Sequence, residues 1–284
     1  MGILRYNFKS EALGMNTDIT ITYPSDQYTY YPPNPSEKGI GPFKRAEKQY
    51  ERDMKFQTVY MLHGGGDDDN LVYRYTRLEY YAAQNNVMTV TPRVNDGFFI
   101  DTEYGIAYYT YITEELPVVV QSLFASSSKR EDNYVLGMAM GGNASLMLAM
   151  KRPDLYAACV DLSGGIGCSI DSEYFVEQVR DTGLLKMKKA FKPAEKLAGS
   201  VFDIGYWARE NKKNGVAVPE LYLGVGENDF IRDVVRKDRD ALQKLGYHIH
   251  YEEAPGLGHE WDFWDRYIQK ALYEWLPLKR QGTR

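Results

Sequence analysis

The strongest constraint on the fold is an alternation of short apolar runs with helical segments, which begins at residue 56. The runs 56–62, 87–91, 134–136, 157–162, 220–225 and 248–253 have the β-branched and aromatic content of buried strands. Helical patterns cover 74–84, 109–126, 233–245, 261–276 and a segment that ends near Pro153. This alternation predicts an α/β fold, with a mostly parallel central sheet and helices on both faces.

The rest of the chain adds less regular segments to this pattern. Residues 3–23 alternate enough to predict antiparallel strands at a sheet edge. Residues 25–52 are rich in proline and charge, and they predict a long loop outside the core, either a plain insertion or a border of a substrate cleft. Residues 170–213 interrupt the alternation and are interpreted as a small inserted cap. With these additions, 284 residues are expected to form a single domain over 1–284.

Composition excludes several classes of function. The formal net charge of −5 disfavours a general nucleic-acid binder, and 44% hydrophobic residues are enough for a sizeable core. The N-terminus lacks the apolar stretch of a signal peptide, and no run is long enough for a membrane span. A cytoplasmic location is the default expectation, although a secreted protein trimmed of its signal would look the same. Cys159 and Cys168 predict neither a disulfide framework nor a metal site, and Cys159 is expected to be a small buried hydrophobe.

Two glycine-rich turns follow predicted strands, where open parallel sheets place their sites. His63-Gly-Gly-Gly (63–66) could aim a backbone amide at a developing oxyanion, or it could be a plain tight turn. Gly137-Met-Ala-Met-Gly-Gly (137–142) has the layout of a nucleophile elbow, G-x-S-x-G, with Ala139 where the serine would stand. The amide of Met140 would lie at the start of the following helix, which favours negative charge. Taken alone, this second turn would be interpreted as a glycine-rich βα turn without chemistry, because Ala139 cannot act as a nucleophile.

Two further loops supply an acid and a base. Asp229 lies beyond the strand 220–225, where a carboxylate can orient a histidine, although acidic loop residues are more often solvated or cap helices. His259 lies between a glycine-containing loop and a tryptophan-rich helix, which suits a base over a cleft. His248 and His250 alternate within a strand and are interpreted as structural or surface groups. Elbow, then aspartate, then histidine is the chain order of the α/β-hydrolase triad.

The sequence resembles the esterase D / tributyrin esterase group of α/β-hydrolases, which takes in feruloyl and acetyl esterases of carbohydrate esterase family 1. The matching stretches lie at 59–64, 95–105, 114–117, 137–142, 226–230 and 258–261. The resemblance implies a serine carboxylic-ester hydrolase that needs no metal or cofactor. It maps the triad onto Ala139, Asp229 and His259, and the oxyanion amides onto Gly65 and Met140. S-formylglutathione hydrolases tend to carry Thr-Cys where this chain has Gly65-Gly66, which disfavours that substrate.

The expected substrate is a small-molecule or plant-polysaccharide-derived ester with a short acyl or hydroxycinnamoyl group. Substrate contacts are assigned to His63, Gly64, Trp207, Trp261 and Trp264, although tryptophans packed on a core are more common. Neither a nucleic acid nor a membrane is expected as a partner, and a homo-oligomer is left open. A peptidase or thioesterase on the same scaffold is a weaker alternative, because a triad does not select the leaving group.

Ala139 has two explanations. A deliberate serine-to-alanine change would remove the nucleophile and leave the elbow intact. A natural non-catalytic relative, which binds an ester or carbohydrate, would also lack it. The first explanation is preferred because Asp229, His259 and the elbow glycines are all present, and drift would be expected to erode them too. Ser145 and Ser163 do not fit as substitute nucleophiles, because they lie within the helix and at the end of another strand.

Overall fold

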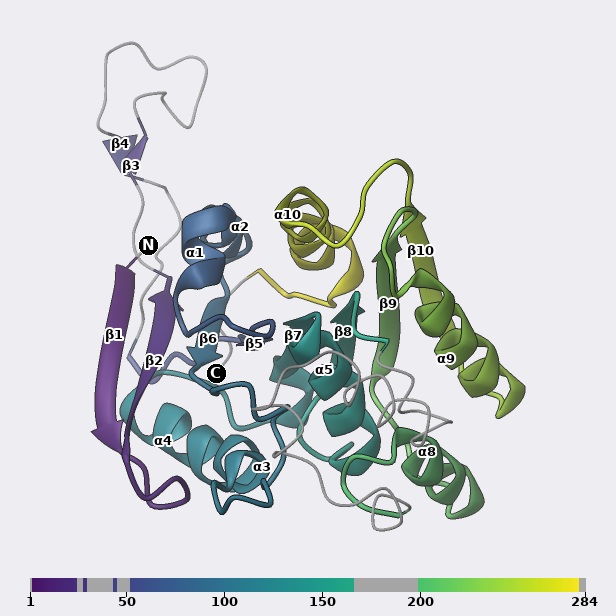
Figure 1. Cartoon of the computed structure of the whole chain (residues 1–284). Helices are drawn as coiled ribbons and strands as arrows, with labels where there is room; N and C mark the ends of the chain where they lie inside the picture. Colours follow the sequence, from purple (N-terminus) through teal and green to yellow (C-terminus); the bar gives the residue numbers. More distant parts are fainter. Residues whose placement is uncertain (1, 25–27, 30–42, 45–51, 166–198, 281–284) are drawn as a thin grey trace.

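A computed structural model describes residues 2–24, 28–29, 43–44, 52–165 and 199–280. Within these residues, one sheet has eight strands in the order β1-β2-β6-β5-β7-β8-β9-β10 (Figure 1). Their bounds are β1 Gly2–Lys9, β2 Asn16–Tyr23, β5 Thr58–Leu62, β6 Met88–Pro92, β7 Asn133–Met138, β8 Ala158–Leu162, β9 Glu220–Gly226 and β10 Ile249–Ala254. A separate short ladder joins β3 (Tyr28–Thr29) to β4 (Phe43–Lys44).

The sheet is mostly parallel, as the sequence predicts. All neighbouring pairs from β6 to β10 are parallel, whereas β1 pairs with β2 and β2 with β6 in antiparallel fashion. The prediction of antiparallel strands at one edge is therefore confirmed. Every residue of β5, β7 and β8 is buried, which is expected of central strands covered on both faces.

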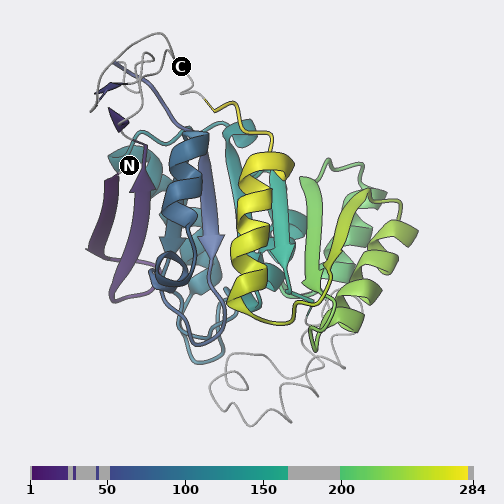
Figure 2. The same ribbon diagram turned by 90° about the horizontal axis from the view of Figure 1, so that it is seen from above.

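Helices cover both faces of the sheet. One face carries α1 (Leu71–Tyr75), α2 (Leu78–Asn85) and α10 (Trp261–Lys270), which the π-helical turn η4 (Ala271–Trp275) continues (Figure 2). The other carries α3 (Tyr108–Thr110), the π-helical turn η1 (Tyr111–Glu115), α4 (Leu116–Leu123), α5 (Met140–Lys151), α8 (Ile204–Lys213) and α9 (Arg232–Lys244). A 3-10 turn, η2 (Arg130–Asp132), precedes β7.

Alternation along the strands divides the core into two layers. In β5, Val59 and Met61 join the apolar cluster under α2 and α10, whereas Tyr60 and Leu62 join the cluster under α4 and α5. Successive side chains of a strand point to opposite faces, so a fully apolar run serves both layers. Cys159 is buried in the second layer, as predicted.

Two predicted segments lie largely outside the described residues. Of the loop at 25–52, the structure describes little beyond β3 and β4. Of the cap at 170–213, it describes residues 199–213, in which α8 packs beside the last turn of α5. There the Asn211 side-chain amide donates to the carbonyl of Met150 at 2.6 Å. Cys168 also lies outside the described residues.

Among the residues described, no helix combines the length and the apolar character that crossing a bilayer requires.

Candidate active site

The turn between β7 and α5 is strained at its central residue. Ala139 has φ 50° and ψ −116°, a backbone conformation that residues with a β-carbon rarely adopt. Its amide donates to the carbonyl of Leu162 at 2.9 Å, which ties the turn to the end of β8. A β-carbon at Gly137 would lie 1.9 Å from the carbonyl oxygen of Gly141, and one at Gly141 would lie 2.0 Å from that of Leu62. The flanking glycines are therefore required by packing, whatever residue occupies position 139.

The loops after β9 and β10 bring an acid and a base together. His259 Nδ1 lies 3.0 Å from Asp229 Oδ2 and 3.2 Å from Oδ1. The Asp229 carboxylate also accepts hydrogen bonds from the Ile231 amide at 3.0 Å and from the Ser163 hydroxyl at 2.7 Å. Burial disfavours the charged carboxylate, but the bonds from His259, Ile231 and Ser163 outweigh burial and lower the pKa of Asp229. Asp229 thus remains an anion that holds the imidazole through Nδ1.

Ser163 is a site residue that sequence reasoning missed. It follows β8 directly, is fully buried, and has φ 57°, a second strained backbone position at this edge. Its hydroxyl bonds to the same carboxylate oxygen that lies nearest His259. A small polar residue at the carboxyl end of a core strand was the available signal. The partner lies 66 residues further along the chain, so no local pattern could identify it.

The elbow and the acid–base pair belong to one continuous network. Ala139 is bonded to Leu162, the next residue Ser163 is bonded to Asp229, and Asp229 is bonded to His259. All of these groups lie at or just beyond the carboxyl ends of β7, β8, β9 and β10. Ala139 also packs against the apolar cluster that contains Trp264. The structure therefore gathers the three predicted triad positions at one edge of the sheet.

The turn after β5 lies against the elbow. A β-carbon at Gly64 would be 3.6 Å from the β-carbon of Ala139. Within the turn, the Gly66 amide donates to Asp96 Oδ1 at 2.6 Å and the Asp67 amide to the Gly64 carbonyl at 3.4 Å. No acceptor for the exposed Gly65 amide is found within the described part of the chain. Met140 is the first residue of α5 and places its amide at that helix N-terminus.

His63 does not line the site, contrary to its assignment from sequence. Its ring is only 1% exposed. Nε2 accepts the Val94 amide at 3.0 Å, so the proton is on Nδ1, which donates to the Gly64 carbonyl at 2.8 Å. Burial lowers the pKa of His63, which keeps the imidazole neutral. The side chain therefore fixes the peptide that precedes Gly65, and neither nitrogen is left for a substrate.

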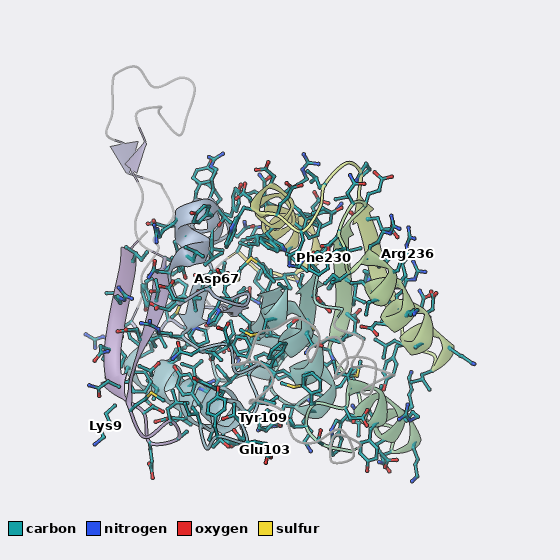
Figure 3. The ribbon with its side chains drawn as sticks, viewed as in Figure 1. Lys9, Asp67, Glu103, Tyr109, Phe230 and Arg236 are labelled. Carbon is teal, nitrogen blue, oxygen red and sulfur yellow. The ribbon has the colours of Figure 1, made fainter. Side chains whose placement is uncertain are left out.

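Two aromatic side chains contact His259, and Trp207 is not one of them. Trp264 meets the imidazole edge-on at 5.0 Å between ring centroids, and Phe230 lies at 4.7 Å. Phe230, labelled in Figure 3, is 79% exposed. Trp261 contacts Trp264 at 5.1 Å and stacks on Tyr75 at 5.1 Å. The ring of Trp207 lies instead 3.3 Å from Lys151 Nζ, at the last residue of α5. The 12 residues of α5 span roughly 18 Å, so Trp207 is remote from position 139.

An acidic cavity adjoins the turn after β5. Its volume is about 450 Å³, and it is lined by Gly66, Asp67, Asp68, Leu71, Arg93, Asn95 and Asp96. Burial, reinforced by the charges of Asp68 and Asp96, raises the pKa of Asp67 to about 6. Asp67 (labelled in Figure 3) is also the nearest side chain to the Gly64 position, at 3.1 Å from the site of its missing β-carbon. The approach to position 139 is therefore polar and rich in carboxyl groups on this side.

The sheet, its helical layers and the loops at its carboxyl edge define an α/β-hydrolase. The chain belongs to the Esterase family, whose profile matches residues 48–275. It is similar to an acetyl esterase of Caldicellulosiruptor saccharolyticus, with 26% identity over 284 residues that cover 97% of this chain and 98% of that protein.

Solved structures share the fold at lower identity. FphF, a fluorophosphonate-binding serine hydrolase of Staphylococcus aureus, superposes with a TM-score of 0.79 at 24% identity, covering 97% of this chain and 98% of FphF. A CE1 ferulic acid esterase from Anaeromyces mucronatus, solved in complex with ferulic acid, gives a TM-score of 0.59 at 14% identity, covering 94% of this chain and 89% of that one. The family match supports a carboxylesterase-type function, whereas these solved structures show the fold alone.

Proposed function

We propose that this edge of the sheet is the active site of a serine carboxylic-ester hydrolase in which alanine occupies the nucleophile position. The observation that supports it most directly is the Asp229–His259 pair, with Oδ2 and Nδ1 3.0 Å apart, linked through Ser163 and Leu162 to the strained elbow at Ala139. A strained strand-to-helix turn that presents its central side chain to an oriented histidine is the arrangement used for acyl transfer.

In the serine form, each residue has a definite task. The hydroxyl at position 139 attacks the ester carbonyl while His259 takes its proton, later returns it to the leaving alcohol, and then activates water. Asp229 holds the imidazole through Nδ1, which leaves Nε2 to exchange the proton. The amides of Gly65 and Met140 stabilise the oxyanion, the first from an exposed turn and the second from the N-terminus of α5. Water then releases the acyl group and regenerates the serine.

The substrate that we infer is an uncharged ester with a short acyl or hydroxycinnamoyl group. Phe230, Trp261 and Trp264 offer aromatic surface beside His259, which suits a phenolic ring. The acidic cavity beside Gly66 would repel a negatively charged leaving group and can accept hydrogen bonds from sugar hydroxyls. The acetyl esterase and ferulic acid esterase similarities support the same two acyl classes.

Restoring the serine tests this function. We expect Ala139→Ser to hydrolyse at least one of nitrophenyl acetate, tributyrin and methyl ferulate, with turnover roughly 10⁴–10⁶ times that of the chain with Ala139. The matched control is Ala139→Ser combined with His259→Ala, which should return the rate to that of the Ala139 chain. A folded serine form that leaves all three esters intact would refute the proposal.

A non-catalytic binding protein is the second candidate, and Ala139 itself favours it. An intact pocket without a nucleophile could retain an ester or an acylated carbohydrate unchanged. Calorimetric titration of the Ala139 chain with methyl ferulate and with an acetylated oligosaccharide measures this binding. Saturable binding together with an inactive serine form would replace the enzyme by this second function.

A further inference from the structure

Three side chains with metal-binding atoms meet at the other end of β9 and β10, away from the candidate active site. Glu220 begins β9, His248 directly precedes β10, and His250 is the second residue of β10. The two strands are parallel with Ile249 opposite Leu221, so His248 lies opposite Glu220 when this register is continued by one residue. Positions 248 and 250 share one face of the sheet because strand side chains alternate.

The side chains already converge on a common point. One ligand atom from each of the three residues lies within 4.8 Å of the other two. His250 Nε2 is 3.8 Å from Glu220 Oε2, and the two imidazole rings lie 4.4 Å apart between centroids at 84°. All three side chains are exposed, so an ion could reach them directly from solvent.

An aromatic stack holds one of the two imidazoles in place. The ring of His250 stacks on Tyr222 at 4.5 Å and 14°, and Tyr222 stacks in turn on Trp275 at 5.4 Å and 16°. Tyr222 lies opposite His250 in the strand register, and its other face is covered by the helical turn η4. Fixing a ligand ring before the ion arrives reduces the entropy lost on binding.

We propose that Glu220, His248 and His250 form a binding site for a divalent transition-metal ion, for which Zn²⁺ is the best match. Two imidazoles and one carboxylate are a zinc ligand set that leaves one position open, and imidazole selects zinc, copper and nickel over magnesium and calcium. Tetrahedral coordination with bonds of about 2.0–2.1 Å puts ligand atoms about 3.4 Å apart. The ligand atoms now lie within 4.8 Å of one another, so each pair has to close by about 1.4 Å at most.

An ion at this site would clamp the edge of the sheet. Among the strands that the structure describes, β10 lies at the edge of the sheet and is paired only with β9. The carboxyl ends of the same two strands lead into the loops that carry Asp229 and His259. An ion that bridges the amino ends of β9 and β10 would oppose the separation of β10 from β9. It would thereby keep Asp229 and His259, in the loops at the other ends of these strands, aligned with each other.

Titration of the tag-free Ala139 chain with Zn²⁺, followed by calorimetry, tests the site directly. We expect one equivalent to bind, and Co²⁺ in place of Zn²⁺ to give the visible absorption of a four- or five-coordinate ion. His248→Ala and His250→Ala should each weaken binding at least tenfold, and Glu220→Gln should weaken it measurably. His259→Ala is the control and should leave the affinity unchanged.

Hydrogen exchange provides a second readout that does not depend on catalysis. Saturating Zn²⁺ should slow amide exchange in 249–254, and this effect should disappear in the His248→Ala/His250→Ala double variant. Absence of saturable one-equivalent binding, or equal affinity in the double variant, would overturn the proposal. Equal affinity would place the ion elsewhere, for example in the acidic cavity beside Asp67. Binding without slower exchange would overturn the clamping role.

Discussion

At the carboxyl edge of the sheet, the candidate site combines two residues with strained backbone conformations and one buried carboxylate, that of Asp229. Ala139 and Ser163 both have positive φ, a conformation that costs on the order of 1–3 kcal/mol for a residue other than glycine. Both are held by long-range bonds, Ala139 to Leu162 and Ser163 to Gly224 and Asp229. The strained residues therefore lie at two adjacent strand ends beside the buried carboxylate of Asp229, where these bonds hold them in place.

The hydroxyl of Ser163 should matter for turnover in the serine form. Combining Ser163→Ala with Ala139→Ser removes one of the groups that hold Asp229, and the loss of a hydrogen bond to a charged group predicts a decrease of about tenfold in kcat. KM should change little, because the buried Ser163 side chain does not reach the substrate. Steady-state kinetics on nitrophenyl acetate would measure both constants.

Ser145 provides the matched control. It is an equally buried serine whose hydroxyl bonds to the carbonyls of Gly142 and Val160 and not to Asp229. Ser145→Ala should lower stability without the loss of kcat. If both variants lower kcat equally, Ser163 acts only through the stability of the fold.

At the scale of helices, the tryptophans of α8 and α10 have different expected roles. Trp207 on α8 is structural, whereas Trp261 on α10 is a candidate substrate contact. Trp207 lies against Lys151 at the far end of α5, and its indole donates to the Ser200 carbonyl at 2.8 Å. Trp261 lies at the start of α10, next to Trp264 and His259. In the serine form, Trp261→Ala should raise KM for methyl ferulate several-fold, whereas Trp207→Ala should leave KM unchanged and lower the unfolding midpoint in urea. The reverse pattern would place the aromatic specificity surface on α8.

Helix boundaries show where sequence patterns are sufficient and where they are not. The predicted strands match the observed ones within two or three residues, because buried runs of apolar residues leave few alternatives. The helix predicted at 74–84 is divided instead into α1 and α2. The break is fixed by Asp265, which accepts the Arg77 amide at 2.8 Å from 188 residues away. The predicted helix at 109–126 likewise contains the π-helical turn η1.

The same limit applies to the site. The order of the motifs along the chain was enough to predict that the elbow, Asp229 and His259 lie at one edge of the sheet. The reason is that the carboxyl ends of parallel strands lie at the same edge. It could not assign Ser163, Trp207 or His63 correctly. Their surroundings are set by partners that are distant in sequence or by packing at the other end of a helix.

For the whole molecule, a buried carboxyl behind the elbow should govern how stability depends on pH. Asp161 on β8 is 1% exposed, and burial together with the charge of Asp238 raises its pKa to about 8. Between about pH 4 and pH 8 the folded chain keeps this proton while the unfolded chain loses it. The unfolding free energy should therefore fall as pH rises through this range, by at most about 1.4 kcal/mol per pH unit for this group.

Asp161→Asn removes this titration and should flatten the dependence between pH 5 and pH 8, as measured by urea denaturation at each pH. The exposed Asp240 is the control, and Asp240→Asn should leave the slope as it is. A slope in Asp161→Asn equal to that of the parent chain would mean that Asp161 is ionised in the folded protein.

The spatial order β5-β7-β8-β9-β10 follows the order of these strands along the chain. As the polypeptide leaves the ribosome, β7 can add to β5, and β8, β9 and β10 can each add to the strand made just before, from the centre of the sheet outward. The elbow would then be in place long before the imidazole that completes the triad emerges, some 120 residues later. A nascent or prematurely terminated copy would display the turn without its base, so ester cleavage by the serine form could begin only once residue 259 had emerged.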